Sequence, residues 1–440
     1  MVTHVNKGVF QAFLGVFIIS KRALFIPRAL QNERIKIQSL INNNLELDGV
    51  MVEYHIYKYR PFHNNMKSIV QTVLNYNNDA IVLLDPRTDI LQYAGSSLRA
   101  KKTVRQFFKL IEYSGNDPPE PSVLGGQLDK LISEMKRTIN DMFSTVILGR
   151  NPRRFLIPPY FVAENYGDSW YRLSLKSLKK VCSDKGEYSV VAPIVFKGNL
   201  LRGSVLEKIV EDYVEMDECV DMYLIIPYEL DEIRVAEDKL LRLAELINKM
   251  SSKTSKPIFV NIGEFGNVLV ALGADGLVSG ICWRATLKMP PLVGGMLPIS
   301  NTQSQVYFHS IFKKLYIEYT LRFLEEIPYA YSCDCPICQS KKKFSESWID
   351  VIQLFEDIPE YSIHYYYWKI KELEMYYRNP YLLMQDLENG RKLIREYNRR
   401  VGDEYFFLDG NLKIRYQIDE GYLERWLNVL RKLISSPNQG

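Results

Sequence analysis

The 440-residue sequence lacks a hydrophobic run long enough to cross a bilayer. Its longest early apolar run, Gly8 to Ile19, contains Gln11 and two glycines and stops at Lys21-Arg22. At about 12 residues it falls short of the roughly 20 that a membrane helix needs, and no small-residue cleavage site follows it. We therefore expect strands in this segment and no membrane partner.

Cysteine and excess charge are also scarce. Six cysteines are too few for a disulfide framework in a chain of this length, which favours a cytoplasmic location. The 56 basic and 52 acidic residues give a net charge of +4, which excludes a strongly basic nucleic-acid binder but permits a local positive groove. With 47% hydrophobic residues and no low-complexity tract or tandem repeat, the chain has the composition of a folded protein with a large core.

What the sequence does contain is an alternation of short apolar runs and amphipathic stretches. Helix-like stretches such as Val205 to Tyr213 and Leu230 to Met250 lie between β-branched runs, which is the rhythm of βα units around a parallel sheet. The predicted strands are 24–26, 49–52, 81–85, 155–158, 188–195, 222–226, 257–260 and 276–280. These are enough to close an eight-stranded barrel. A doubly wound open sheet is the alternative, although no Gly-x-Gly-x-x-Gly follows any strand.

The composition changes after about residue 330, where strand signals disappear and aromatic and charged residues dominate. Glu372 to Arg400 has the pattern of a helix, and we expect a helical tail packed on the barrel. Six tyrosines gather here, and their rings could stack on nucleic-acid bases or, more commonly, pack at helix interfaces. They are Tyr361, Tyr365, Tyr366, Tyr367, Tyr376 and Tyr377.

Three of the six cysteines fall within six residues, at Cys333, Cys335 and Cys338, and His364 follows downstream. Three thiolates and one imidazole form a closed tetrahedral set that suits structural zinc, because no position stays open for water. The alternative is an iron–sulfur cluster with a fourth thiolate from Cys182, Cys219 or Cys282. The other histidines show no ligand spacing.

The Cys-x-Cys-x-x-Cys spacing with a distant histidine, placed after a barrel-like run, resembles the zinc site of the guanine transglycosylases. These enzymes exchange a guanine in tRNA, or in one branch in DNA, for a 7-deazaguanine base. The resemblance covers most of the chain and is closer in layout than in identity. The matching segments are 25–30, 51–61, 81–85, 192–198 with 202–205, 256–263 and 271–280.

The resemblance implies an α/β fold, namely a (β/α)8 TIM-type barrel over residues 1–328, an inserted zinc-binding segment over 329–368 and C-terminal helices over 369–440. It also implies chemistry at the C-terminal ends of the strands. Asp85 matches the strand that carries the family's first essential aspartate. Lys197, Gly198 and Arg284 match positions that contact the substrate base or nucleic acid. Family members dimerise through the zinc region, so we expect a homo- or heterodimer.

Four departures from the family pattern concern the site itself. Val278 stands where the family has its nucleophilic aspartate, and Pro158 or Pro159 stands where an acidic residue holds the guanine. The sequence 227–231 replaces a glycine-rich loop, and Arg284 with Lys288 replaces a pair of arginines that read tRNA.

Base exchange needs a carboxylate nucleophile and an acid–base group. We predict Asp85 as the acid–base carboxylate, with turn capping as its other reading. Asp275, Glu229 and Glu264 are the substitute candidates for the nucleophile, although Asp275 lies three residues from the family position and favours a structural role.

Basic residues gather at 341–343, at 150–154 and along 391–400, where they could contact phosphates. Three functions follow from these patterns. The first is a diverged transglycosylase acting on tRNA or DNA. The second is a catalytically inactive accessory or nucleic-acid-binding subunit, and the third is a barrel enzyme of unrelated chemistry.

Overall fold

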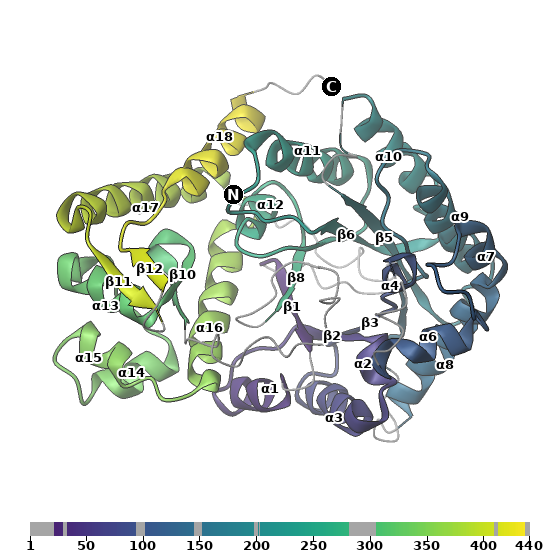
Figure 1. Cartoon of the computed structure of the whole chain (residues 1–440), viewed down its shortest axis with the longest axis horizontal. Coiled ribbons are helices and arrows are strands. Elements are labelled where there is room, and N and C mark those ends of the chain that lie inside the picture. Colours follow the sequence, from purple (N-terminus) through teal and green to yellow (C-terminus); the bar gives the residue numbers. More distant parts are fainter. Residues whose placement is uncertain are drawn as a thin grey trace, which may run out of the picture.

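Eight parallel strands form one sheet that curves into a barrel (Figure 1). The computed structural model describes residues 22–29, 33–93, 102–144, 152–197, 201, 203–280, 305–408 and 412–435. The early run Gly8–Ile19 lies outside these residues. The strands are β1 (Leu24–Ala29), β2 (Gly49–Glu53), β3 (Ile81–Asp85), β4 (Phe155–Leu156), β5 (Ser189–Lys197), β6 (Val220–Tyr228), β7 (Ile258–Asn261) and β8 (Gly276–Gly280). Their order, β3-β2-β1-β8-β7-β6-β5-β4, confirms the predicted (β/α)8 barrel and excludes the open-sheet alternative.

β3 and β4 stand at the two ends of this order, and side-chain hydrogen bonds join the segments that follow them. The hydroxyl of Thr88 donates to the carbonyl of Tyr160 at 2.6 Å and accepts from the Tyr160 amide at 2.8 Å. The Gln92 amide pairs in the same way with the backbone of Val162, at 2.9 Å and 2.8 Å. These four hydrogen bonds take the place of a backbone ladder beyond the short strand β4, because they satisfy buried backbone groups that would otherwise lack partners.

The barrel encloses its own apolar core. Inward positions alternate along each strand, as the pleat of a strand requires. Ile26, Met51, Leu83, Leu224 and Phe259 are among the buried residues that fill the interior. Gly276 faces Phe259, and a Cβ on this glycine would lie 2.2 Å from the Phe259 ring. The interior is therefore packed with side chains and is not a channel.

Helices surround the strands and bury one stripe each. In α3 the buried residues Met66, Ile69, Val70, Val73 and Leu74 recur at the three- and four-residue spacing of one helix face. The helices around the barrel are α1 (Glu33–Asn42), α2 (Tyr54–Tyr57), α3 (Arg60–Tyr76), α4 (Asp89–Tyr93), α6 (Lys102–Leu110), α7 (Pro121–Gly126), α8 (Leu128–Phe143), α9 (Ser169–Ser183), α10 (Val205–Val214), α11 (Glu237–Lys253) and α12 (Gly266–Ala271).

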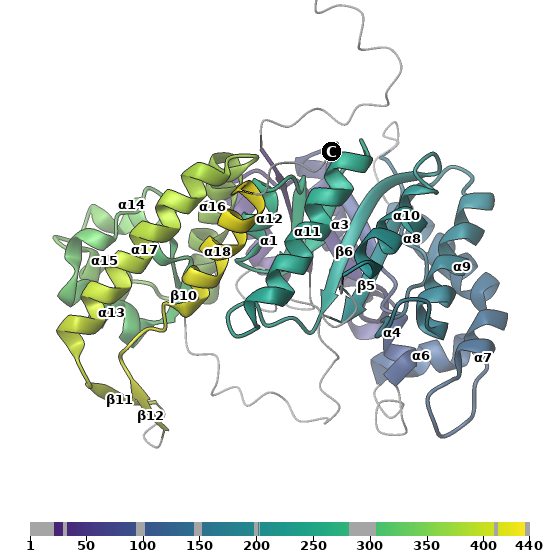
Figure 2. The ribbon, with the colours of Figure 1, turned by 90° about the horizontal axis from the view of Figure 1, so that it is seen from above.

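The C-terminal part lies beside the barrel, with α16 between the two (Figures 1 and 2). It comprises β9 (Gln305–Phe308), β10 (Lys313–Tyr316), α13 (Ile317–Glu326), α14 (Pro336–Lys342), α15 (Trp348–Gln353), α16 (Ile358–Tyr376), α17 (Pro380–Val401), β11 (Tyr405–Leu408), β12 (Leu412–Arg415) and α18 (Gly421–Ser435). α18 runs back along α11 of the barrel. None of the described helices combines the length and the apolarity of a membrane span.

Several boundaries differ from the sequence expectations. The helix expected over Leu230 to Met250 begins at Glu237, because Asp231 first forms a turn in which its carbonyl accepts from the amides of Arg234 and Val235. Two hairpin strands, β11 and β12, occur where the sequence predicted helices alone. The predicted boundary between residues 368 and 369 falls inside α16, and β9 and β10 pack with the C-terminal part although they precede residue 328.

A disulfide joins Cys182, at the end of α9, to Cys219, just before β6. This bond was not expected from the sequence. These two cysteines are consequently not ligands of an iron–sulfur cluster, which removes two of the three thiolates considered for that alternative.

Candidate functional site

The last inward-facing position of most strands is polar, in contrast to the apolar interior below. Arg28 follows Ile26 by two residues on β1, Glu53 follows Met51 on β2, and Asp85 follows Leu83 on β3. By the same spacing Lys197, Tyr228 and Asn261 end β5, β6 and β7. Two-residue spacing puts these side chains on the inner face of the barrel, at the C-terminal end where barrel enzymes carry their chemistry. We call these six residues the polar layer.

Arg28 is the centre of the polar layer. Its Nη2 donates to Oδ2 of Asp85 at 2.6 Å and to Oε1 of Glu53 at 2.8 Å. Its Nη1 donates to Oδ1 of Asn261 at 3.5 Å. One guanidinium thus links the ends of β3, β2 and β1, which are neighbours, with the end of β7, which lies beyond β8. All four residues are buried, so these contacts act in a medium of low dielectric constant.

A second arginine contacts the same group of carboxylates. Arg87, whose φ of 50° is left-handed, donates from Nη1 to Oε1 of Glu53 at 3.1 Å. Its Nε and Nη2 reach both oxygens of Asp89 at 3.0 and 3.1 Å, a bidentate pair. Three buried carboxylates, Glu53, Asp85 and Asp89, therefore share two guanidiniums. If all were ionised, the group would carry one surplus negative charge.

Asp85 is the carboxyl of this group best placed to hold a proton. It is 1% exposed, and burial raises its pKa, against the opposing influence of Arg28 and Arg87. Its Oδ1 accepts from the Tyr160 hydroxyl at 2.6 Å and from the Arg87 amide at 3.1 Å. His55, which lies 3.5 Å from Glu53, is neutral at pH 7 because burial lowers its pKa to about 4.

Two tyrosines and a lysine lie on the other side of the polar layer. The rings of Tyr93 and Tyr228 are nearly parallel, at 17°, with centroids 6.2 Å apart. The Tyr228 hydroxyl donates to Asp89 at 3.2 Å. Lys197 lies 5.2 Å from the centre of the Tyr93 ring and pairs with Glu164 at 2.6 Å. Tyr228 is 2% exposed, whereas Tyr93 is only partly buried, so the Tyr93 ring is the aromatic surface beside these charged groups that suits a planar, polar ligand such as a nucleobase.

The structure separates the four acidic residues that the sequence suggested. Asp85 lies in the polar layer, whereas Asp275 immediately precedes β8 and lies at the opposite end of the barrel. Its Oδ2 accepts from the Ile258 amide at 3.0 Å and its Oδ1 from the Tyr377 hydroxyl at 2.9 Å. Asp275 and Asp85 cannot act on one substrate from opposite ends of the barrel. The position of Asp275 therefore agrees with the structural role that the sequence favoured.

Glu264 and Glu229 both follow strands at the productive end. Glu264 is buried and pairs with Lys369 of α16 and, at 3.5 Å, with Lys314. This ion pair ties the barrel to the C-terminal part, and the two lysines hold the pKa of Glu264 below its usual range although burial opposes them. Glu229 directly follows β6, is exposed, and has a left-handed φ of 57°.

The position that the resemblance matches to a nucleophilic aspartate is apolar in the folded structure. Val278 is fully buried in the barrel interior, and its carbonyl accepts from the Asn261 side chain at 3.0 Å. Gly198 and Arg284, which were predicted to bind substrate, lie outside the described residues. So do residues 30–32 and 281–304, which directly follow β1 and β8.

The four predicted metal ligands come together in the C-terminal part. The sulfurs of Cys333, Cys335 and Cys338 lie 3.4, 3.5 and 3.6 Å from Nδ1 of His364, and all four ligand atoms lie within 4.8 Å of one another. A tetrahedral zinc with bonds of about 2.3 Å to sulfur and 2.0–2.1 Å to nitrogen would set these distances near 3.6 Å. The buried group can hold a metal ion and is compatible with zinc.

The surroundings orient the imidazole for this task. Nε2 of His364 lies 2.8 Å from the Tyr307 carbonyl, so it carries the proton and leaves the lone pair of Nδ1 facing the three sulfurs. The indole of Trp368 donates to the Cys333 sulfur at 3.1 Å, and amides of the turn donate to two sulfurs. Such donors stabilise thiolate charge.

The predicted nucleic-acid contacts are less well supported. Arg153 pairs with Asp221, Arg154 with Glu187, and Arg395 with Glu420, so much of the basic charge is matched within the chain. Four of the six clustered tyrosines are buried, which agrees with helix packing: Tyr361, Tyr365, Tyr366 and Tyr376.

Sequence reasoning missed most of the polar layer. Arg28, Glu53 and Asn261 were not singled out, and neither were Arg87 and Asp89. The available signal was positional, because each of the first three stands two residues after a buried strand residue at the C-terminal end of a strand.

No family model matches this chain, and no curated protein sequence is similar to it. The relation to the guanine transglycosylases therefore stays a resemblance of layout.

Proposed function

We propose that the protein is a diverged guanine transglycosylase that binds a guanine of tRNA or DNA at the polar layer and exchanges it for a 7-deazaguanine. The observation that carries the proposal is the position of Asp85, a buried carboxyl with a raised pKa at the C-terminal end of a barrel strand. Buried titratable groups at this end of such barrels are typical of catalytic sites. In this proposal the ring of Tyr93 receives the planar base, and the protein acts in the cytoplasm.

Asp85 acts as the acid–base group. Protonated, it gives its proton to the guanine as the bond to C1′ of the sugar breaks, and as a carboxylate it takes a proton from the incoming base. The nucleophile must be a carboxylate that bonds to C1′ and leaves again when the new base attacks. We assign this role to Glu229, because it is the exposed member of the candidate set at this end of the barrel.

The Cys333–Cys335–Cys338–His364 group holds zinc in this proposal. Four protein ligands leave no open coordination position, so the metal stabilises the C-terminal part and takes no part in base exchange. Cys333 and Cys335 lie in the turn that leads into α14, Cys338 lies in its first turn, and His364 lies on α16. Zinc bound between them positions the helix that carries Lys369 to Glu264.

A catalytically inactive accessory subunit is the second candidate, and Val278 favours it. A valine cannot attack C1′, and the Asp85 oxygens already accept from Arg28, Tyr160 and the Arg87 amide. Such a subunit would bind nucleic acid or pair with an active transglycosylase.

Exchange of labelled guanine into tRNA and into duplex DNA separates the two candidates, with a denaturing gel to detect a covalent adduct. The first candidate predicts exchange with one of the two substrates, loss of turnover in Asp85→Asn, and loss of the adduct in Glu229→Gln. The matched control is Glu218→Gln, which removes an exposed carboxylate just before β6, at the other end of the same strand. Salt-sensitive binding without any exchange would establish the accessory role instead.

A further inference from the structure

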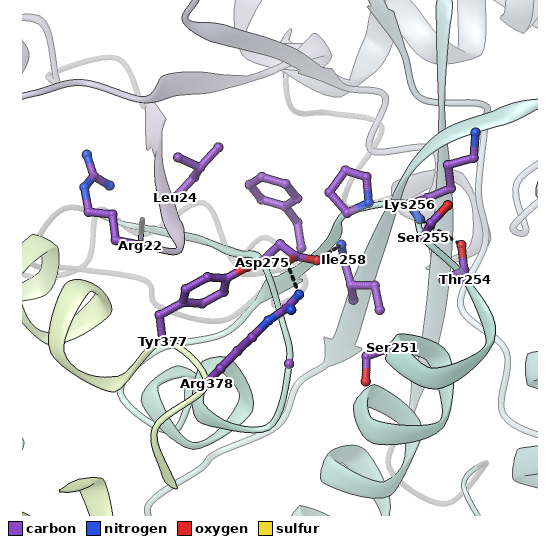
Figure 3. Close-up of a pocket in the computed structure, with 13 residues that line it drawn as sticks. Arg22, Leu24, Ser251, Thr254, Ser255, Lys256, Ile258, Asp275, Tyr377 and Arg378 are labelled. Carbon is purple, nitrogen blue, oxygen red and sulfur yellow. Dashed lines mark hydrogen bonds and ion pairs between the residues drawn. The ribbon is translucent and has the colours of Figure 1, made fainter. Parts of the chain in front are cut away.

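A pocket of about 320 Å³ opens at the N-terminal ends of β1, β7 and β8, at the end of the barrel opposite the polar layer (Figure 3). It lies where the barrel meets the junction of α16 and α17, which contributes Tyr377 and Arg378. Its volume is at the lower end of the range for small-molecule sites. The proposed function does not use it.

The lining combines an apolar part with cations at both sides. Leu24, Pro257 and the ring of Tyr377 supply apolar surface. In Figure 3 the Arg378 side chain extends toward Asp275, and Lys256 lies on the other side of Ile258 with its side chain directed away from Arg378. A ligand that fits both parts has a flat or apolar body and an anionic group.

The charges of the pocket do not balance. Asp275 is held by the Tyr377 hydroxyl and the Ile258 amide, and it pairs with Arg378 at 3.3 Å. Arg22 is matched by Asp48 at 2.7 Å and by Glu46 at 2.8 Å. Within the part of the chain that the structure describes, no carboxylate lies within ion-pair distance of Lys256. One positive charge is left over.

Three hydroxyl residues line the pocket near this surplus cation in the sequence, namely Ser251, Thr254 and Ser255. The Ser251 hydroxyl donates to the Asn248 carbonyl and the Thr254 hydroxyl to Asp217, so Ser255 supplies the hydroxyl donor for a ligand. Gly273, with a φ of 116°, lies against Ser251, and a Cβ there would lie 3.0 Å from the Ser251 hydroxyl oxygen. Lysine, arginine and hydroxyl donors around one space are the groups that bind phosphate.

Arg378 is well placed to contribute a second cation. Its side chain is 64% exposed, and its guanidinium makes one long contact with Asp275. The residue has a left-handed φ of 54° at the break between α16 and α17, which directs the side chain over the pocket instead of along a helix. An unusual backbone conformation of this kind costs free energy, which the contacts of the residue must offset.

We propose that this pocket binds a phosphate group carried by a small organic molecule of up to nucleotide size. Lys256 and Arg378 contact the phosphate, the Ser255 hydroxyl donates to it, and Tyr377 with Leu24 and Pro257 covers the organic part.

Isothermal titration of the full-length protein tests the site with GMP, guanosine and inorganic phosphate as probes. We expect saturable binding of GMP, with guanosine bound roughly tenfold more weakly or not at all. Lys256→Ala and Arg378→Gly should each weaken GMP binding by about tenfold, and glycine suits the left-handed backbone at residue 378. Lys253→Ala, which removes a nearby exposed cation outside the lining, is the matched control and should leave GMP binding within about twofold.

A second arm identifies the source of the phosphate. If a guanine-free oligonucleotide, dT12, competes with GMP and its binding also depends on Lys256, the phosphate belongs to nucleic acid that reaches this end of the barrel. If dT12 does not compete, the ligand is a free small molecule. Glu229→Gln should leave GMP affinity at this pocket unchanged, so the site stands or fails separately from base exchange. Equal affinity for GMP and guanosine, no binding of any probe, or unchanged GMP binding in Lys256→Ala would overturn the proposal.

Discussion

Nη2 of Arg28 and Oδ2 of Asp85 lie 2.6 Å apart at the C-terminal end of the barrel, and the same nitrogen lies 2.8 Å from Glu53. The pair is buried, so its two charges depend on each other far more than a surface pair would.

Replacing Arg28 by alanine should therefore be strongly destabilising. It leaves three buried carboxylates facing the single guanidinium of Arg87, and removal of one partner of a buried pair typically costs 3–5 kcal/mol, so we expect about that loss in the free energy of unfolding. Urea denaturation measures it. Arg34→Ala, which removes an exposed arginine on neighbouring α1, should change stability by less than about 0.5 kcal/mol. Similar values for the two variants would show that the polar layer does not hold the charges as described.

Glu232 should make stability depend on pH. Burial, followed by the charge of Glu264, raises its pKa to about 7, with the amides of Glu264 and Phe265 and the charge of Lys369 opposing. Between the ordinary pKa of 4.5 and about 7 the folded protein binds more protons than the unfolded chain. The free energy of unfolding contributed by Glu232 therefore falls as pH rises through this range, by on the order of 3 kcal/mol.

The measurement compares wild type with Glu232→Gln in denaturant titrations at several pH values from 4.5 to 7.5. His55 titrates with the opposite sign, because its folded pKa is lowered, but it is present in both proteins and cancels in the difference. Because glutamine stays neutral, the free energy of unfolding of the wild type should fall relative to that of Glu232→Gln as pH rises through this range. Parallel curves would mean that Glu232 carries no raised pKa.

The disulfide between Cys182 and Cys219 should stabilise the barrel. It closes a loop of 37 residues, for which chain entropy predicts a stabilisation of about 4 kcal/mol. A reductant that leaves zinc thiolates intact should lower the melting temperature of the wild type but not that of the double variant Cys182→Ser, Cys219→Ser. If the reductant has no effect on the wild type, the disulfide does not form in solution, as the predicted cytoplasmic location would favour.

The sequence predicted the barrel well because buried parallel strands are continuous apolar runs, and Ile81–Asp85 and Gly276–Gly280 were placed to the residue. The metal ligands were equally easy to predict from the sequence, because three of the four lie within six residues. The hairpin β11–β12 was missed although its strands flank an Asp-Gly pair, a common turn signal in hairpins.

The contacts of the polar layer could not be predicted from single positions. Arg28 meets Asp85 and Asn261 only because β1 lies between β2 and β8, and this order is a property of the closed sheet. The same holds for Glu264, whose partner Lys369 follows it by more than 100 residues. The sequence identified Glu264 as an acidic loop residue, and only the fold shows that its carboxylate pairs with Lys369.

Metal analysis is the next test of the resemblance. Purified protein should contain about one zinc per chain, and Cys335→Ser should lose it, because structural zinc contributes on the order of 10 kcal/mol to the folding of small zinc domains. Ser340→Ala, an exposed residue of the same α14, is the control and should retain the metal.

X-ray absorption at the zinc edge tests the centre of this account most directly, because both the resemblance and the position of α16 depend on the Cys333, Cys335, Cys338 and His364 group. We predict three sulfur ligands at about 2.3 Å and one nitrogen at 2.0–2.1 Å. Protein without zinc, or zinc bound by nitrogen and oxygen alone, would contradict it.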